Sequence, residues 1–180
     1  MYPIVRVIKE YLRARRMPPL EPLGTHVSYH RCWPQDIDNF LEMNNGRILS
    51  ILDIGRTGLA ARVGLIAALA RNRWALTIAG SSARYRRRIR PFAKFRIVSR
   101  AVGWDHRFFY IEQTIWLGAE CAVQVLYRSA VTDKNGIVAP ERVFADVGFD
   151  GTPPVLPAWA QNWIDADNTR LWPPEHDGTS

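Results

Sequence analysis

Acidic and amide residues between positions 36 and 45 are the first that could do chemistry. In the stretch WPQDIDNFLEMNNGR, Asp36, Asp38 and Glu42 precede Asn44 and Asn45, and a long apolar segment follows. A carboxylate in such a place can attack a carbonyl or deprotonate water, and the amides at the start of a helix can polarise that carbonyl. Asp and Asn also cap helices, so chemistry and simple capping are both open.

A second group is the arginine-rich stretch SSARYRRRIRPFAKFR, residues 81–96. On a strand, alternate residues face the same side of the sheet. The arginines that would share one face are Arg84, Arg86, Arg88 and Arg90. Arginine suits bidentate phosphate contacts, and the alternatives are lipid headgroups, nucleic acid or a solvated face that guards against edge pairing. No nucleic-acid-binding motif accompanies the charge, so we expect no nucleic-acid partner.

The elements that must position these residues follow from the hydrophobic pattern. Apolar residues recur at three- and four-residue steps over residues 44–64 and predict a helix that is apolar on most faces. Alternating strand formers separated by short turns, such as GWD and LGAE, predict an antiparallel sheet. The predicted strands span residues 25–33, 73–90, 94–103, 107–117 and 120–132.

This order of one strand, one long helix and four strands is accompanied by a family resemblance. The segment DIDNFLEMNNGRILSILDIGR and the later YRRRIRPFAKFRIVSRAVGWDHRFFYIEQTIW resemble thioesterase-like hot dog proteins of the 4-hydroxybenzoyl-CoA thioesterase type. The similarity covers roughly residues 25–140. It implies an α+β hot dog fold, in which an antiparallel sheet wraps around a long central helix.

The resemblance also implies a reaction, the hydrolysis of an acyl-CoA thioester. In such enzymes the second acid of a D-x-D motif is the catalytic carboxylate, which selects Asp38 as base or nucleophile. Backbone amides near Asn44 and Asn45 would assist. Related sequences often carry Gly-His where Leu41 and Glu42 stand here, so Glu42 is an additional acid near the site.

The resemblance implies partners as well. The substrate would be an acyl-CoA whose phosphates one or more of the four arginines hold, and the protein would be a homodimer or a dimer of dimers. No cofactor is expected. The alternative function is a hot dog protein that binds acyl thioesters or lipids without hydrolysing them. A dehydratase is less well supported, since it would need a histidine paired with an acid near the helix.

Composition excludes several other classes. The 180 residues are 47% hydrophobic and 23% charged, with a net charge of +7, which is typical of one globular domain that attracts anions. No apolar run is long enough for a membrane span or a signal peptide, and two cysteines make no disulfide framework. We therefore expect a cytoplasmic protein. His26 and His30 would lie about 13 Å apart on a strand, so we expect no metal site.

The chain divides into three predicted parts. Residues 21–145 form the hot dog domain, residues 146–180 a proline-rich extension with a short helix, and residues 1–20 an N-terminal amphipathic helix. Within that helix, residues 2–16 carry an apolar face beside several basic residues. Either the helix packs on the domain or a partner subunit, or it makes a peripheral contact with an anionic membrane surface.

Overall fold

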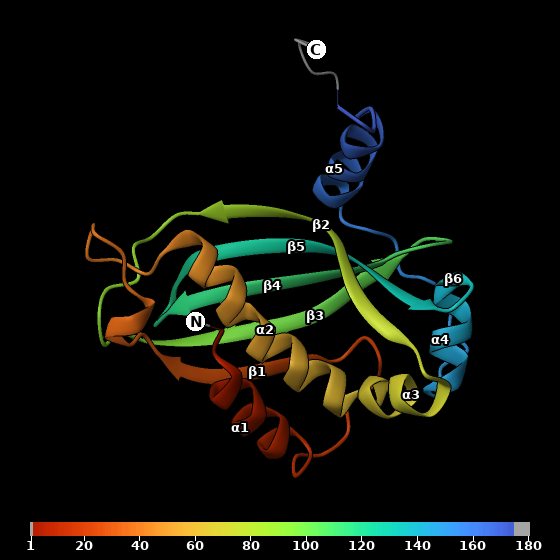
Figure 1. The fold of residues 1–180 in the computed structure, drawn as a ribbon, viewed down its shortest axis with the longest axis horizontal. Coiled ribbons are helices and arrows are strands. Elements are labelled where there is room, and N and C mark those ends of the chain that lie inside the picture. Colours follow the sequence, from red (N-terminus) through yellow and green to blue (C-terminus); the bar gives the residue numbers. More distant parts are fainter. Residues whose placement is uncertain (1, 175–180) are drawn as a thin grey trace.

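The computed structural model describes residues 2–174 of the chain. Its elements follow the predicted order of one strand, one long helix and four further strands, to which the structure adds the three-residue strand β6 and several short helices (Figure 1). In chain order the elements are α1 (Ile4–Ala14), β1 (Thr25–Arg31), the 3-10 helix η1 (Pro34–Asp36), α2 (Asn45–Arg62), α3 (Leu65–Asn72), β2 (Ala75–Tyr85), β3 (Lys94–Trp104), β4 (Phe109–Leu117), β5 (Glu120–Asp133), β6 (Gly136–Val138), α4 (Pro140–Asp146) and α5 (Ala158–Asn168).

The strands form one antiparallel sheet in the order β1-β3-β4-β5-β2, with β6 added alongside β5. Adjacent strands β3, β4 and β5 are joined by short turns, as the sequence predicted. The sheet curls around α2, which lies across one of its faces (Figure 1). The predicted fold class, an α+β hot dog fold, is confirmed.

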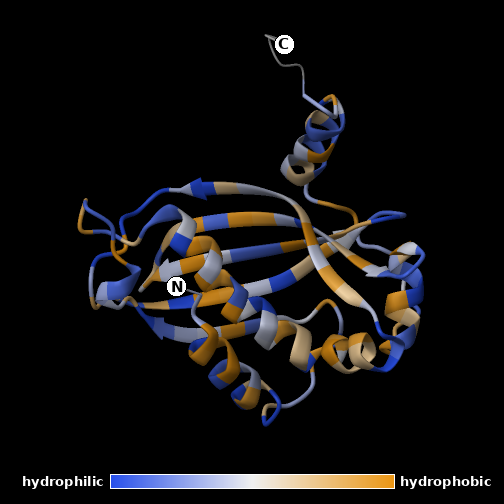
Figure 2. Cartoon of the chain, in the orientation of Figure 1, coloured by the Kyte–Doolittle hydropathy of each residue, from blue (hydrophilic) through white to orange (hydrophobic). Residues whose placement is uncertain are grey.

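Helix α2 is the centre of the core. Ile51, Leu52 and Ile54 are fully buried, and residues on nearly every side of the helix meet the sheet or α1. The ribbon coloured by hydropathy shows the apolar content of α2 and of the strands behind it (Figure 2). A close approach is needed at Gly58, where an added Cβ would lie 2.2 Å from Nε2 of His26 on β1. Only glycine fits there.

Helix α1 packs on α2 and is tied to the sheet through polar groups. The buried side chain of Glu10 meets Nε2 of His26 at 3.1 Å. Arg6 reaches Asp36 of η1 at 2.8 Å and donates a second hydrogen bond to the Arg31 carbonyl. These contacts fix the orientation of α1 on the domain. No helix among residues 2–174 is long and apolar enough to cross a membrane.

Helix α5 covers part of the opposite face of the sheet. Its residues Ala160 and Ile164 pack on Tyr110 and Leu126, whose side chains point away from α2 because they alternate with the inward-facing ones. Arg128 of β5 donates to Asp167 of α5 at 2.8 Å. The short helix predicted in the C-terminal extension is therefore present, and the last residues of that extension, 175–180, lie outside the described part of the chain.

The strand predicted over residues 73–90 was too long. It ends at Tyr85, because the amides of Arg86 and Arg87 both donate to the Ala122 carbonyl, at 2.8 and 3.2 Å, and the chain then leaves the sheet. The idea that all four arginines alternate along one strand face is wrong, since only Arg84 lies within β2. The other three lie in the β2–β3 connection: Arg86, Arg88 and Arg90.

Candidate functional site at the start of the central helix

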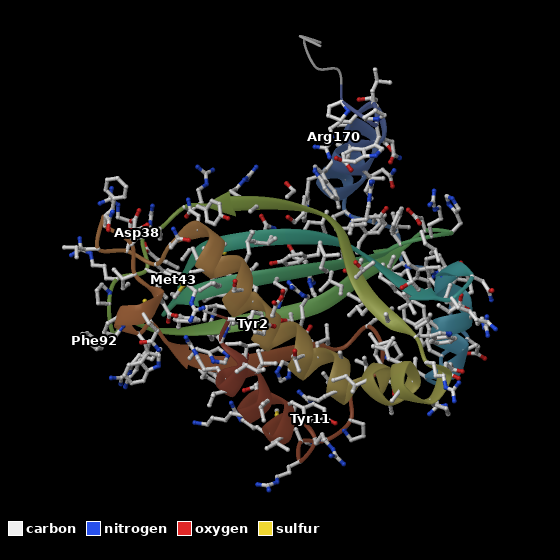
Figure 3. All side chains as sticks on the ribbon, viewed as in Figure 1. Tyr2, Tyr11, Asp38, Met43, Phe92 and Arg170 are labelled. Atoms are coloured by element: carbon white, nitrogen blue, oxygen red, sulfur yellow. The ribbon has the colours of Figure 1, made fainter. Side chains whose placement is uncertain are left out.

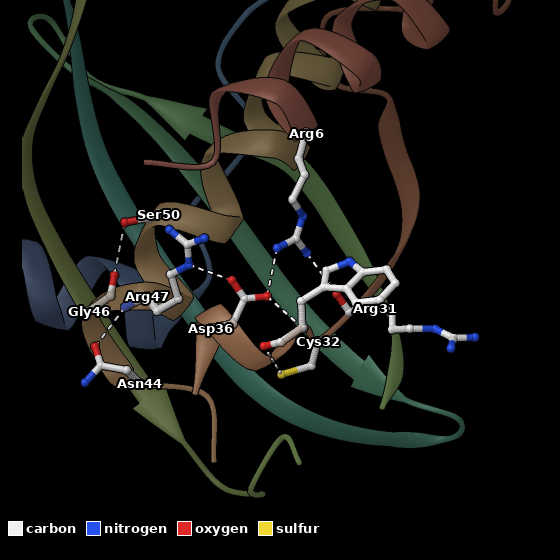
Figure 4. Close-up of polar contacts among 9 residues, drawn as sticks. Arg6, Arg31, Cys32, Asp36, Asn44, Gly46, Arg47 and Ser50 are labelled. Carbon is white, nitrogen blue, oxygen red and sulfur yellow. Dashed lines mark hydrogen bonds and ion pairs between the residues drawn. The ribbon is translucent and has the colours of Figure 1, made fainter. Parts of the chain in front are cut away.

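Asp36, the first acid of the D-x-D motif, is a buried structural residue. Its carboxylate accepts hydrogen bonds from Arg47 Nε at 2.7 Å, from Arg6 Nη1 at 2.8 Å and from the Trp33 amide at 3.0 Å (Figure 4). Burial by itself would raise the pKa of Asp36, but the hydrogen bonds from Trp33, Arg47 and Arg6 outweigh it and lower that pKa. The carboxylate thus joins α1, η1 and α2, and its side chain is fully buried, which makes it a structural group.

Asp38, the second acid, lies on a tight loop just before α2 and is half-buried. Its Oδ1 accepts a hydrogen bond from the Phe40 amide at 2.8 Å, and its own amide donates to the Glu42 carbonyl at 2.9 Å. Leu41 closes the loop in the left-handed region, at φ 58°. Figure 3 shows Asp38 at the same end of the molecule as Phe92, far from α5. Asp38 therefore stabilises its own turn and does not cap α2.

The cap of α2 is Asn44, as the sequence indicated. Its side-chain oxygen accepts a hydrogen bond from the Arg47 amide at 3.1 Å. The first amides of a helix have no partner within the helix, so those of Asn45 and Gly46 remain at the positive end of the helix dipole.

A pocket of about 220 Å³ opens beside this helix start. One wall is formed by Glu42 of the preceding loop and Asn45 at the start of α2. The other is formed by the end of β2 and the connection that follows it, residues 85–89. Across the pocket, Arg88 forms an ion pair with Glu42 at 3.0 Å. Three consecutive arginines, residues 86–88, line the second wall, and two of them pair with acids, Arg87 with Glu120 at 3.3 Å and Arg88 with Glu42. The pocket is therefore basic, with part of its charge compensated.

The pocket brings together some of the predicted site residues. Glu42, Asn45, Arg86 and Arg88 line it. The remaining predicted residues lie outside its lining, namely Asp38, Asn44, Arg84 and Arg90. Asn44 instead lines a second pocket, on the other side of the helix start, together with Asp36 and Arg47. Within residues 2–174, no group of three His, Cys, Asp or Glu side chains could hold a metal ion.

Sequence reasoning missed a polar cluster farther along α2. Arg56 pairs with Asp53 one turn earlier on the helix. It also donates to Gln113 Oε1 at 2.9 Å and lies 3.9 Å from the centre of the Tyr127 ring. Gln113 in turn donates to Ser99 Oγ at 2.7 Å. The sequence signal was the presence of Gln113 and Ser99 at inward-facing positions of otherwise apolar strands.

An apolar cavity adjoins this cluster. It is small, about 70 Å³, and Arg56 forms part of its wall. The rest of the lining is apolar and comes mainly from α2, the sheet and α4, with Leu59, Phe109, Ile111 and Phe144 among the contributors. A cavity of this composition suits a hydrocarbon or aromatic group.

A curled sheet around a central helix, with acids and a basic pocket at the start of that helix, defines the class of hot dog thioesterase-like proteins. The family comparison agrees, since the model of the thioesterase-like superfamily matches residues 32–164. The chain belongs to this superfamily.

Individual proteins show the same relationship. The chain is 36% identical to Protein THEM6 of Xenopus laevis over 103 residues, which are 57% of this chain and 50% of that protein. It thus spans about half the length of the curated relatives it matches. Among solved structures, a 1,4-dihydroxy-2-naphthoyl-CoA thioesterase from Synechocystis has a TM-score of 0.60 at 9% identity, covering 69% of this chain and 95% of that one. A hypothetical protein from Staphylococcus aureus, solved in complex with CoA, has a TM-score of 0.61 at 10% identity, covering 78% and 92%.

Proposed function

We propose that the protein hydrolyses an acyl-CoA-type thioester at the N-terminal end of α2. The observation that carries the proposal is the meeting of the positive end of the buried helix with an arginine-lined pocket, directly beside the loop that holds Asp38. Thioester hydrolysis needs a base or nucleophile and a group that stabilises the oxyanion. Membership in the thioesterase-like superfamily supports the reaction class.

Asp38 is proposed as the base or nucleophile. One of its carboxylate oxygens accepts the turn hydrogen bond from Phe40, which leaves the other to deprotonate water or to attack the thioester carbonyl. The amides of Asn45 and Gly46 would then stabilise the charge that develops on the carbonyl oxygen. In direct attack, the carbon–sulfur bond breaks, CoA leaves as the thiol after protonation, and water hydrolyses the mixed anhydride to the acid.

The arginine segment is proposed to hold the phosphates of CoA. Arg86 and Arg88 line the pocket, whereas Arg84 on β2 and Arg90 beyond the pocket would act only on parts of the nucleotide that extend outside it. The Staphylococcus aureus structure was solved with CoA bound, which makes CoA a reasonable ligand to test first.

We also propose that two copies associate through β2. This strand lies at the edge of the sheet, is 11 residues long, and exposes Leu76, Ile78 and Tyr85. An open edge of this length pairs readily with another strand. A second copy of β2 would continue the sheet and bring a second arginine segment close to the first.

One observation favours the non-hydrolytic alternative, a protein that binds acyl thioesters or lipids. Glu42 stands where related sequences often carry histidine, and here it is neutralised by Arg88. If Glu42 were required for turnover, this ion pair would hold it away from the reaction. Binding without hydrolysis is then the expected behaviour.

The test is thiol release from short, long and aromatic acyl-CoA esters and from the matching acyl-pantetheines, which lack the nucleotide. We expect turnover of at least one CoA ester, with a higher KM for its pantetheine analogue. Arg86→Gln with Arg88→Gln should raise KM for the CoA ester only, whereas the control Arg107→Gln, on the distant β3–β4 turn, should not. Absence of release from every ester, with CoA still bound, would support the binding alternative.

A further inference from the structure

Helix α1 turns an apolar face toward solvent. Ile4, Val5, Ile8 and Leu12 are exposed by 59, 76, 51 and 50%, although all are large aliphatic residues. At about 100° per residue these four fall within an arc of roughly 100° on the helix. We call them the apolar stripe. Isolated exposed aliphatic residues are ordinary, but a continuous stripe along one helix marks an interaction surface.

A basic groove adjoins the apolar stripe. Continuing around α1 by the same count, Lys9 and Arg13 come directly after the stripe, and they line a groove of about 730 Å³ between α1 and the β1–β3 part of the sheet. Arg31, Lys94 and Arg96 line the opposite side. We call this the basic groove.

The charges in the basic groove are largely uncompensated. The one acid in its lining, Glu10, is buried against His26. Arg13 lies 3.7 Å from that same carboxylate. Lys9, Lys94 and Arg31 form no ion pair with an acid in the described part of the chain.

Aromatic side chains complete this surface. Tyr29 of β1 lines the basic groove and is 68% exposed, and Trp33 lies beside it, with the Arg31 guanidinium 5.9 Å from its ring centre. Tyr and Trp favour positions where an apolar medium meets water. Neither residue belongs to the pocket at the start of α2.

We propose that α1 and the basic groove together dock this protein on an anionic phospholipid surface. The apolar stripe would enter the boundary between headgroups and acyl chains, and the lysines and arginines beside it would contact lipid phosphates. The site is separate from the proposed thioesterase pocket and does not depend on its activity.

Charge and apolar character together favour an anionic lipid surface over a second copy of the chain or nucleic acid. A second copy of the chain docked through this same surface would place two basic grooves against each other, and like charges repel. Nucleic acid would match the charge but offers nothing to the apolar stripe. A lipid bilayer with anionic headgroups satisfies both halves of the surface.

The geometry of α1 suits docking as a preformed helix. Its opposite face is fixed to the domain by the Glu10–His26 and Arg6–Asp36 contacts, so the helix need not order on binding. A preordered surface loses less conformational entropy when it binds. The apolar stripe and the flanking cations are therefore presented together.

The experiment is co-flotation of the 180-residue chain with vesicles of phosphatidylcholine alone or with added phosphatidylserine. We expect binding to the anionic vesicles only, and weaker binding as salt rises. Glycerophosphoserine, the soluble headgroup, should not compete at equal lipid concentration. Equal binding to both vesicles, binding to neither, or full competition by the free headgroup would overturn the proposal.

Matched variants test the apolar stripe. Ile4→Ser with Ile8→Ser should weaken vesicle binding by about tenfold or more, because both side chains lose their insertion into the apolar layer. Val155→Ser with Leu171→Ser removes two aliphatic residues elsewhere that are more exposed, by 97 and 67%, and should leave binding unchanged. Unchanged binding by the isoleucine variant, or a change in its oligomeric state by light scattering, would show that the stripe does not insert into lipid.

A second pair tests the charges. Lys9→Gln with Lys94→Gln should weaken binding to anionic vesicles by roughly fivefold for each lysine at low salt. The control Arg107→Gln with Lys134→Gln removes the same net charge from two turns outside the basic groove. If both pairs weaken binding equally, the effect is one of net charge and the assigned groove is wrong.

Discussion

Replacing Asp36 with alanine should lower the free energy of unfolding by about 3 kcal/mol. The Asp36 side chain is 0% exposed, and its loss removes the buried carboxylate that the guanidinium groups of Arg6 and Arg47 both contact. Removing one partner of a buried ion pair costs about 3–5 kcal/mol. We expect the lower end, because the two arginines keep 19 and 13% exposure and water can solvate them in the variant.

Urea unfolding followed by tryptophan fluorescence and circular dichroism would measure this cost. Arg6→Met and the double variant complete a double-mutant cycle, in which the second substitution should cost much less once the first is present. A loss below about 1 kcal/mol for Asp36→Ala would match a solvated surface pair. That result would refute the assignment of Asp36 as the junction between α1, η1 and α2.

The same carboxylate predicts a pH dependence. Because the folded-state pKa of Asp36 is lowered, its contribution is fully present above the ordinary value of 3.8 and is lost as the pH falls through the folded-state pKa. The stability difference between wild type and Asp36→Asn should therefore be constant near neutrality and shrink below about pH 4. A difference that grows in acid would contradict the lowered pKa.

Three further outcomes follow from local geometry. Gly58→Ala should lower the free energy of unfolding, measured by heat or urea, by about 1–3 kcal/mol, because the added Cβ collides with the buried His26 ring. An unchanged free energy would mean that β1 moves away freely. Cys32 is fully buried, and this burial raises the pKa of its thiol to about 11, with a further contribution from the nearby Asp36 carboxylate. The thiol should therefore resist alkylation by iodoacetamide at pH 8 until the chain unfolds. Arg128→Leu should speed amide hydrogen exchange in α5 without affecting α2; unchanged exchange would show that apolar contacts alone hold α5.

Much of the fold could be predicted because its elements have long, regular patterns. Helix α2 has apolar residues at helical spacing over its whole length, and Asn44 caps it through the side chain, as that residue type favours. The β3–β4 and β4–β5 hairpins follow from alternating strands joined by short turns. Such local signals do not depend on distant parts of the chain.

The predicted elements differ from the observed ones where contacts between distant parts of the chain determine the local structure. Alternation continues through Arg86 to Arg90, yet the Ala122 carbonyl captures two amides and ends β2 at Tyr85. Helices α3 and α4 span 8 and 7 residues and were not predicted, because so short a helix depends on packing more than on propensity.

The candidate site also depends on contacts with residues that are distant in the sequence. Asp36 and Asp38 are two residues apart and look alike in the sequence, but Arg6, 30 residues earlier, takes Asp36 into a buried ion pair. The acid that stays half-exposed is the one selected by the family resemblance, Asp38. Its catalytic role, the dimer and the cytoplasmic location stay predictions.

The most direct measurement of the central claim is thiol release from the best acyl-CoA ester by wild type, Asp38→Ala and Asp133→Ala. Asp133 is a matched control, since its Oδ1 accepts a hydrogen bond from the amide two residues later at 2.7 Å, as that of Asp38 does at 2.8 Å. We predict that Asp38→Ala abolishes turnover while the protein stays folded and still binds CoA, and that Asp133→Ala retains wild-type turnover. Turnover by Asp38→Ala at the wild-type rate would contradict the proposed mechanism and leave Asp38 as a turn-stabilising residue.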